Sequence, residues 1–304
     1  MKKLMTIAAT LFAATQIYAQ SVPFLNVNAD PYSHSMGGAT LTLEQNAFTM
    51  SNNSSGMVFS ENKFHIGGAY NSWQPDYMDN SNIGFAAYGS FGKWAIGIGG
   101  KMFSYPSYDI VSGNGIANGS FTPKESSFEG AFAYRISDVL SAGINLRTIS
   151  SKLGDGISAS AFGADISLTY HKEKLSIAGA ITNLGGEINY GSDASYALPT
   201  MAKVGAGYSL ELAQDHNLGL NVEGQLLLNQ SEFMACLGAE YSYDNMLKFR
   251  AGYHMGSETA IPSYGSVGFG LQISTVNLDA AYIFGGGENS VLNGSFGVSL
   301  GLKF

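Results

Sequence analysis

The sequence predicts an all-β protein: an antiparallel transmembrane β-barrel of about fourteen strands, with an N-terminal segment that plugs its interior. The first observation is the stretch 294–304, where apolar residues occupy every even position from Phe296 to Phe304 and Ser, Gly or Lys occupies the odd ones. A period of two indicates a strand between two different environments. The second observation is that this alternation recurs upstream, and the third is the composition of the chain.

The composition is that of an outer-membrane barrel. Among 304 residues there are 39 Gly, 17 Tyr and 18 Phe, but only 7 Pro and 12% charged residues. Soluble globular proteins average about 25% charged residues. The net charge is -8 and no basic residues cluster, so the sequence gives nucleic-acid binding no support. The single cysteine, Cys236, cannot form an internal disulfide, and we interpret it as a small filler at an inward strand position.

The first residues have the layout of a secretory signal peptide. Lys2 and Lys3 precede an apolar run from Leu4 to Thr15, and Ala19 stands before the expected cleavage point. The run is too short to span a bilayer, and no later run approaches the roughly 18 apolar residues that a spanning helix needs. We therefore expect residues 1–19 to be a signal peptide and the mature protein to reach the outer membrane.

Two further regions follow. Residues 20–62 do not alternate, yet they are too apolar for a solvated tail, so we predict an N-terminal plug or hatch segment. Residues 63–304 are predicted to form the barrel. The alternating runs are 63–73, 82–90, 93–104, 126–134, 139–149, 160–170, 174–182, 200–210, 217–227, 232–242, 246–254, 265–273, 276–284 and 294–304.

The connections between these runs differ in length in a regular way. In a membrane barrel the periplasmic turns are short and the outer loops are longer. The expected short turns are 91–92, 135–138, 171–173, 211–216, 243–245 and 274–275. The expected outer loops are 74–81, 105–125, 150–159, 183–199, 255–264 and 285–293, and only 228–231 departs by being short. A soluble β-sandwich has no reason to separate its loops in this manner.

Aromatic residues fall near the ends of the runs, as in the girdles that contact outer-membrane lipids at headgroup level. The final one, Phe304, is a candidate assembly signal, since bacterial outer-membrane barrels commonly end on an aromatic strand. The predicted girdle residues are Tyr70, Trp73, Trp94, Tyr134, Tyr170, Tyr208, Tyr241, Tyr253, Phe284 and Phe304.

The same register directs charged residues into the barrel. Their charges nearly cancel, and buried charges need partners, so we expect ion pairs across a filled lumen. We expect Lys248 and Arg250 to meet acids such as Glu223 or Glu240. The predicted lumen charges are Lys101, Glu129, Arg147, Asp165, Lys203, Glu223, Glu240, Lys248, Arg250 and Asp279, with Lys303 near the end of the last run.

Catalytic, cofactor and metal sites are not predicted. The five histidines are scattered over the plug, strands and turns, and no Cys/His group has the spacing of a zinc site. No Gly-x-Ser-x-Gly elbow joins a strand to a helix. The Gly285–Gly287 run follows a strand but no helix succeeds it, which argues against a phosphate loop. We therefore assign no enzymatic role and no cofactor.

Several short patches of the chain form recognisable motifs. In the N-terminal segment these are Phe24-Leu25-Asn26, Ser35-Met36-Gly37-Gly38-Ala39, Glu44-Gln45-Asn46-Ala47-Phe48 and Asn53-Ser54-Ser55-Gly56-Met57. Further along they are Asn183-Leu184-Gly185, Leu198-Pro199-Thr200 and Gly205-Ala206-Gly207-Tyr208. Together these patches resemble two passages of the PorV/PorQ family of outer-membrane proteins, with Ser54 where the family usually has Pro. The similarity covers the mature chain in layout, but only these patches in motif.

The resemblance implies a FadL-like barrel with fourteen strands and an N-terminal hatch. It also implies a non-enzymatic role in the type IX secretion system of Bacteroidota, where such proteins work at the cell surface with partner proteins that receive or attach secreted cargo. Aromatic residues in loops 105–125 and 183–199 are either anchors for such partners or packing over the barrel mouth. Two alternatives remain: a FadL-like channel for hydrophobic small molecules, and a purely structural barrel.

Overall fold

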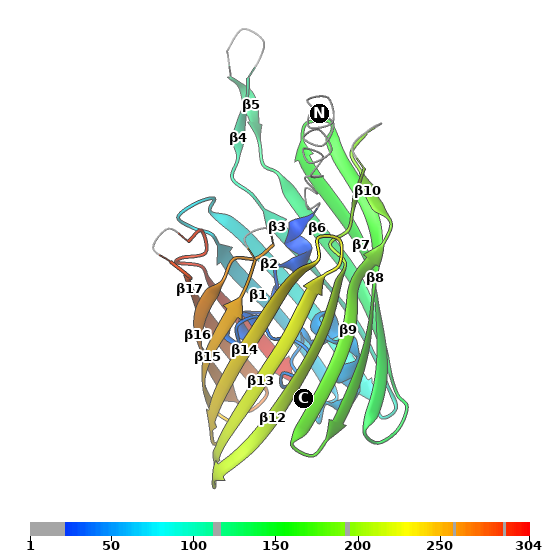
Figure 1. The fold of residues 1–304 in the computed structure, drawn as a ribbon, viewed down its shortest axis with the longest axis vertical. Helices are drawn as coiled ribbons and strands as arrows, with labels where there is room; N and C mark the ends of the chain where they lie inside the picture. The colour runs from blue at the N-terminus through cyan, green and yellow to red at the C-terminus, as the bar shows by residue number, and fades with distance from the viewer. Residues whose placement is uncertain (1–21, 112–116, 192–194, 258–259, 288–289) are drawn as a thin grey trace, which may run out of the picture.

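The computed structural model describes residues 22–111, 117–191, 195–257, 260–287 and 290–304, so the predicted signal peptide lies outside the described residues. Fourteen antiparallel strands close into one barrel, in which β1 pairs with β18 (Figure 1). The predicted fold class is thereby confirmed. The barrel strands are β1 Phe64–Trp73, β2 Asn80–Phe91, β3 Trp94–Ser104, β6 Lys124–Arg135, β7 Leu140–Gly154, β8 Ile157–Lys172, β9 Leu175–Gly185, β12 Met201–Ala213, β13 His216–Leu227, β14 Glu232–Tyr243, β15 Leu247–Met255, β16 Tyr264–Ile273, β17 Val276–Gly285 and β18 Phe296–Lys303.

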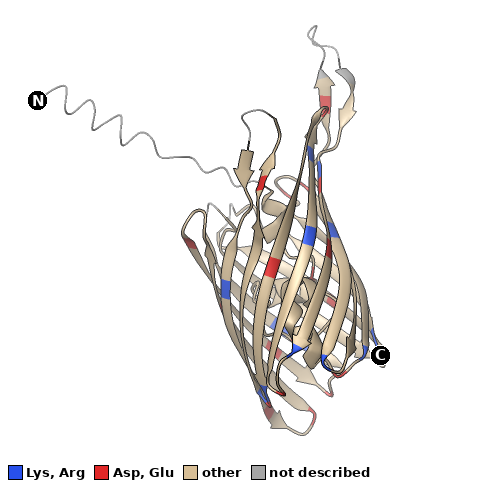
Figure 2. Ribbon diagram, turned by 90° about the vertical axis from the view of Figure 1, so that its right-hand side faces the viewer, with Lys and Arg blue, Asp and Glu red and all other residues tan. Residues whose placement is uncertain are grey.

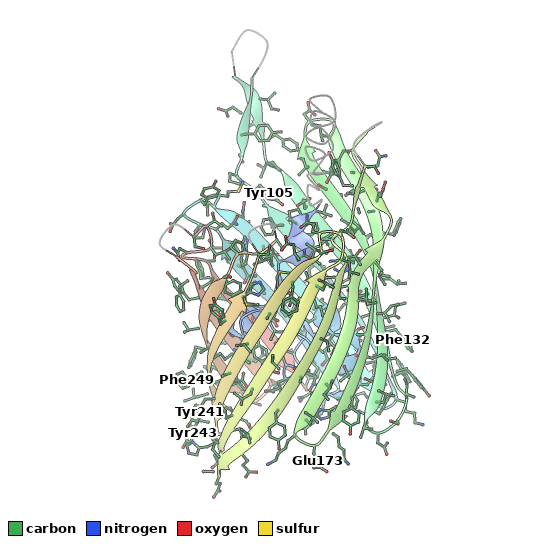
Figure 3. All side chains as sticks on the ribbon, in the orientation of Figure 1. Tyr105, Phe132, Glu173, Tyr241, Tyr243 and Phe249 are labelled. Atoms are coloured by element: carbon green, nitrogen blue, oxygen red, sulfur yellow. The ribbon has the colours of Figure 1, made fainter. Side chains whose placement is uncertain are left out.

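The alternation of the sequence becomes the two faces of the wall. Along β18, Phe296, Val298 and Leu300 are about half exposed on the outside, while Ser299 faces the lumen and is buried. Phe132 and Phe249 likewise point away from the barrel (Figure 3). Charged residues are sparse along the ribbon (Figure 2). The outer face is therefore an apolar belt suited to the bilayer.

The long outer connections carry structure that the sequence did not reveal. The hairpin of β4 (Tyr108–Val111) and β5 (Ala117–Phe121) projects beyond the barrel, and β10 (Glu187–Asn189) pairs with β11 (Ser195–Ala197) (Figure 1). The predicted loop 150–159 is wrong, because β7 and β8 remain paired as far as Gly154 and Ile157. Strands that extend past the bilayer keep their hydrogen-bond ladder but no longer need lipid-facing residues, so their alternation fades.

One predicted girdle residue faces the other way. Trp73, the last residue of β1, is buried inside the barrel, and its ring lies 5.2 Å from that of His34. The other predicted girdle aromatics, such as Tyr134 and Tyr253, are exposed or partly exposed on the outside. Trp73 thus belongs to the packing of the lumen and not to the lipid contact.

The lumen holds the N-terminal segment, which forms short helices: η1 Pro23–Asn26, α2 Pro31–Ser35, α3 Thr49–Asn52 and η2 Ser54–Phe59. Asp30 caps α2, and its carboxylate accepts hydrogen bonds from the Tyr32 amide and the Ser33 hydroxyl, both at 3.1 Å. Among the described residues, no helix combines the length and the apolar character needed to cross a membrane.

Two apolar clusters pack this segment against the wall. Val22, Phe24 and Leu25 join a cluster near the outer loops, together with Trp73 and Ile149. A second cluster lies nearer the short turns and contains Phe48, Met50, Met57 and Val58, packed on alanines of β1, β2, β3 and β6. The segment therefore runs through the lumen from the loop end to the turn end of the barrel.

Candidate functional site

The candidate site is the contact between the plug, defined here as residues 22–62, and the inner wall. Its closest point is a glycine contact. Gly37 has a φ of 66°, and a Cβ added at Gly252 of β15 would stand 2.0 Å from the Gly37 nitrogen. Met36 is fully buried here and its atoms lie against Gly238. The Ser-Met-Gly-Gly-Ala patch is thus the place where the plug backbone touches the wall.

A second contact of the plug is made by hydroxyl groups. The Ser167 Oγ of β8 accepts a hydrogen bond from the Ser55 amide at 3.0 Å and lies 3.1 Å from the Ser54 Oγ. A Cβ added at Gly143 of β7 would stand 2.4 Å from the Ser55 nitrogen. Small inward residues therefore leave the room into which this second family patch fits.

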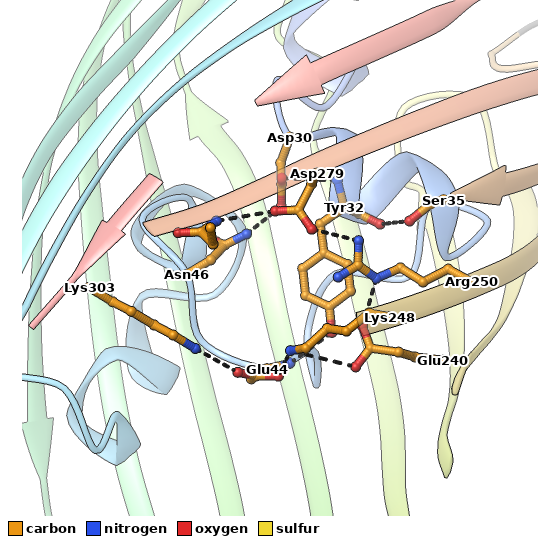
Figure 4. A network of polar contacts seen from close by, with 11 residues as sticks. Asp30, Tyr32, Ser35, Glu44, Asn46, Glu240, Lys248, Arg250, Asp279 and Lys303 are labelled. Atoms are coloured by element: carbon orange, nitrogen blue, oxygen red, sulfur yellow. Dashed lines mark hydrogen bonds and ion pairs between the residues drawn. The ribbon is translucent and has the colours of Figure 1, made fainter. Parts of the chain in front are cut away.

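The predicted charge Arg250 lies at the centre of a network between plug and wall (Figure 4). Its Nε is 2.6 Å from Glu240 Oε2, and its Nη1 is 2.6 Å from Asp279 Oδ1. The guanidinium also stacks 4.0 Å from the centre of the Tyr32 ring in the plug. Only 2% of the Arg250 side chain is exposed, and its single positive charge is shared between two largely buried acids.

Glu44 of the plug completes the same network at the turn end. It pairs with Lys248 of β15, and its Oε1 is 3.1 Å from Lys303 Nζ of β18. The positive charges of Lys248 and Lys303 lower the pKa of Glu44, although 45% of its side chain is exposed. Glu44 is therefore a carboxylate that fastens the plug to two strands of the wall.

Asp30 has the opposite environment within the plug. Burial, together with the negative charge of Asp279, raises the pKa of Asp30 to about 6. Hydrogen bonds from Asn46, Tyr32 and Ser33 offset part of this effect. The cap of α2 is thus a carboxyl group whose proton is held far more firmly than in water.

A third charged group surrounds Arg147 of β7. Arg147 pairs with Asp165 and lies 3.2 Å from Glu129 Oε2. Its Nη1 donates to the Asn183 Oδ1 at 3.1 Å. Asn183 has a φ of 56°, its amide donates to Asp165 Oδ1 at 2.7 Å, and its side chain donates to the Pro199 carbonyl at 3.1 Å. Hydrogen bonds of Asn183 therefore join the Asn-Leu-Gly and Leu-Pro-Thr patches to each other and to the Arg147 group on the inner face of the barrel.

The remaining predicted charges do not all form ion pairs. Of the two acids expected to meet Lys248 and Arg250, Glu240 does so and Glu223 does not, because Glu223 Oε2 accepts hydrogen bonds from the plug amides of Thr40 and Leu41 at 2.7 and 2.9 Å. A carboxylate that is saturated by backbone donors no longer needs a cation. Glu240 does meet both cations, although Lys248 is 3.9 Å away.

The two other lysines also lack acids. Lys101 donates to the plug carbonyls of Leu25 and Val27 at 3.0 and 2.7 Å. Lys203 has no hydrogen-bond or ion-pair partner within the part of the chain that the structure describes.

The aromatic residues of the outer loops fall into two groups. Tyr105 donates to Glu125 at 2.5 Å and packs on the outer cluster, whereas Tyr108 and Tyr196 are exposed.

Phe304 closes the barrel at the turn end. Its amide donates to the Phe64 carbonyl at 3.1 Å, its carbonyl accepts from the Phe64 amide at 2.8 Å, and the two rings are 5.8 Å apart. About half of the Phe304 side chain is exposed on the lipid side. The seam between the first and last strands therefore ends on an aromatic pair.

Sequence reasoning missed several residues that hold the plug. Glu44, Thr40 and Asn183 lie outside the alternating faces, so a search for inward strand charges passes over them. The signal that could have found Glu44 and Asn183 is their place in the patches that resemble the PorV/PorQ family, and Thr40 directly follows one of these patches. No group of three or more His, Cys, Asp or Glu residues able to hold a metal occurs in the described residues.

Solved structures similar to this fold are outer-membrane channels. The toluene transporter TbuX of Ralstonia pickettii has a TM-score of 0.62 at 15% identity, covering 90% of this chain and 98% of its own. The toluene transporter TodX of Pseudomonas putida has a TM-score of 0.64 at 13% identity, covering 89% and 96%. A FadL homologue of Pseudomonas aeruginosa has a TM-score of 0.50 at 12% identity, covering 91% and 97%. These likenesses define the class: a FadL-like barrel of the outer membrane.

The family follows from the sequence. Residues 12–232 match the family described as Type IX secretion system protein PorV, and the chain belongs to this family. No curated protein matches the chain in sequence. Both the family and the fold class are those of non-enzymatic barrels, as predicted from the sequence.

Proposed function

We propose that the protein is a closed, non-conducting component of type IX secretion that receives or attaches secreted proteins at the cell surface. The observation that supports this is the filled lumen. The plug crosses it from end to end and is bound on several sides of the wall, through Glu44, Tyr32, Thr40 and Ser55. A barrel whose interior is occupied in this way has no open pore, so its outer loops are the part that can bind other proteins.

The proposed division of the chain follows the same logic. Residues 1–19 are the signal peptide, 20–62 the plug, and 63–304 the outer-membrane barrel. The barrel anchors the protein among outer-membrane lipids, and the lumen charges hold the plug. Phe304 serves as the assembly signal.

The outer hairpins are the proposed contact with partner proteins. Tyr108 of β4 and Tyr196 of β11 are 45% and 40% exposed beyond the barrel, where no lipid covers them. Exposed tyrosines of this kind are favoured anchors in protein interfaces. Tyr105 and Tyr190, by contrast, pack on the outer cluster and stabilise the barrel mouth.

Recovery of partners from detergent-solubilised membranes tests this proposal. The full-length protein should bring secretion-system proteins with it, and the double variant Tyr108→Ala/Tyr196→Ala should lose them while its barrel stays heat-modifiable on gels. The control is Tyr77→Ala, which removes a still more exposed tyrosine, 72% exposed, from a different loop. Recovery of the same partners by the double variant would contradict the role of the hairpins.

The second candidate, a channel for hydrophobic small molecules, is favoured by the likeness to TbuX and TodX, which are described as toluene transporters. The lumen argues against it here. Its cavity beside the plug is lined largely by polar residues, including Lys101, Arg147 and Asp165. Toluene uptake by proteoliposomes separates the two functions: a channel accelerates it, and a plugged secretion component does not.

A further inference from the structure

A cavity of about 70 Å³ lies between the plug and the inner wall. We call it the lysine cavity. Three cations line it, Lys101, Arg147 and Lys203, but only two acids, Glu129 and Asp165. A volume of this size holds a few water molecules or one small ion, and it is too small for a hydrocarbon chain. The excess of positive charge in this partly enclosed space favours an occupant of negative charge.

The two acids are already saturated by protein groups. Both pair with Arg147, and Glu129 also accepts hydrogen bonds from Ser51 and from Asn145 at 2.9 Å. Asp165 accepts from the Asn183 amide at 2.7 Å. Neither acid lies within ion-pair distance of a lysine, so both acids pair directly with Arg147 and act on the lysines only from a longer distance.

The lysines retain free hydrogen-bonding capacity. The ammonium group of Lys101 has three hydrogens, and two of them are directed to the carbonyls of Leu25 and Val27. Lys203 has no partner among the described residues, and it lies near enough to Lys101 to act on its charge. Lys101 and Lys203 thus line one cavity with N–H groups that have no acceptor, and such groups attract an acceptor of negative charge.

Two buried donors on the same cavity point to the same ligand. The Nε of Arg147, in a residue that is 7% exposed, and the Nδ2 of Asn26 are buried and have no acceptor. An N–H group left without an acceptor in the interior is costly, and native proteins rarely tolerate it. A ligand that only accepts hydrogen bonds would satisfy both.

The cavity also contains His34, a neutral imidazole whose free nitrogen needs a hydrogen-bond donor and not an anion. Burial, with the nearby charge of Lys101, lowers the pKa of His34 to about 4, although its hydrogen bond to the Asn28 carbonyl acts to raise it. Because the Nε2 of His34 meets that carbonyl at 2.9 Å, its open Nδ1 is an acceptor. Water between the ligand and the imidazole fulfils this requirement.

We propose that the lysine cavity is a binding site for a small inorganic anion, held by Lys101 and Lys203 and by the free N–H of Arg147. Bound there, the anion joins the plug, which contributes the carbonyls that position Lys101, to β3, β7 and β12 of the wall. The site is independent of the secretion role and depends only on the seated plug.

Trp73 lines the cavity and reports on it directly. The chain has two tryptophans, so a Trp94→Phe background leaves Trp73 alone. The protein is refolded from urea into detergent with iodide already present, at ionic strength held constant with gluconate, so that no entry path is needed. We expect saturable quenching of Trp73 fluorescence by iodide that chloride competes away, with little quenching by neutral acrylamide.

Variants of single lysines test whether these residues bind the iodide. Lys203→Gln should weaken iodide binding roughly tenfold or more, which is the cost of one lost charge-assisted hydrogen bond. Because Lys203 has no protein partner, this variant is expected to fold normally. Lys93→Gln, on an exposed turn, is the control and should bind iodide as the parent does. Absent or unsaturable quenching, or equal binding by Lys203→Gln, would overturn the proposal and leave a cavity that holds only water.

Discussion

Replacing Arg250 by Met should destabilise the barrel by about 3–5 kcal/mol, the cost of leaving a buried charge without its partner. The structure supplies the reason for a value at the upper end. Arg250 serves two acids at once, Glu240 and Asp279, each at 2.6 Å, and 2% of its side chain is exposed. Methionine fills much of the same volume, so the loss reflects charge more than packing.

The measurement is the free energy of unfolding in urea, followed by fluorescence of the protein in detergent micelles. The control for charge is the triple variant Arg250→Met/Glu240→Gln/Asp279→Asn, which removes the orphaned acids and should regain roughly 2 kcal/mol or more. The control for surface effects is Lys93→Met on an exposed turn. An Arg250→Met barrel as stable as its parent would refute the view that Arg250 stabilises the buried carboxylates of Glu240 and Asp279.

Three further changes test other contacts. Deleting Phe304 should lower the yield of folded, heat-modifiable barrel, because it removes the aromatic pair with Phe64 at the seam; normal yields would contradict its role as an assembly signal. Gly252→Leu should unseat the plug and raise conductance in planar bilayers, since its Cβ would stand 2.0 Å from the Gly37 nitrogen, whereas Gly219→Leu, with its nearest atom at 3.9 Å, should not. Because the pKa of Asp30 is raised to about 6, its ionisation opposes folding, and stability from this group should rise as the pH falls from 7 to 4.5, by roughly 2 kcal/mol. The Asp30→Asn variant should lack this part of the pH dependence when urea midpoints are compared at the two pH values, and an unchanged dependence would exclude the assignment.

The barrel could be predicted because a closed sheet between lipid and lumen imposes a period of two on every strand. Each predicted run overlaps one observed strand, and the terminal run is β18. Prediction failed where that constraint ends. β7 and β8 extend past the bilayer without alternating. Trp73, in contrast, keeps the period of two: it lies on the same inward face of β1 as Ala69 and Asn71, so the register itself excludes it from the girdle.

The candidate site could be predicted only in part. Period alone identified Arg250 and Glu240 as inward residues on neighbouring strands, and they are paired. The period could not reveal Glu44, which lies in the irregular plug segment. It also could not reveal Asn183, whose own left-handed backbone conformation interrupts the alternation of β9. It also could not show that Glu223 binds plug amides, because backbone donors leave no mark in a sequence.

The most direct test of the closed-barrel account is the conductance of the intact mature protein in planar lipid bilayers. The account predicts no porin-like channel from the full protein and a marked conductance once residues 22–62 are deleted or displaced. Gly252→Leu provides the displaced form should the deletion fail to fold. Open-porin conductance from the intact protein would contradict the plugged lumen, and with it the main physical support for a secretion component over a channel.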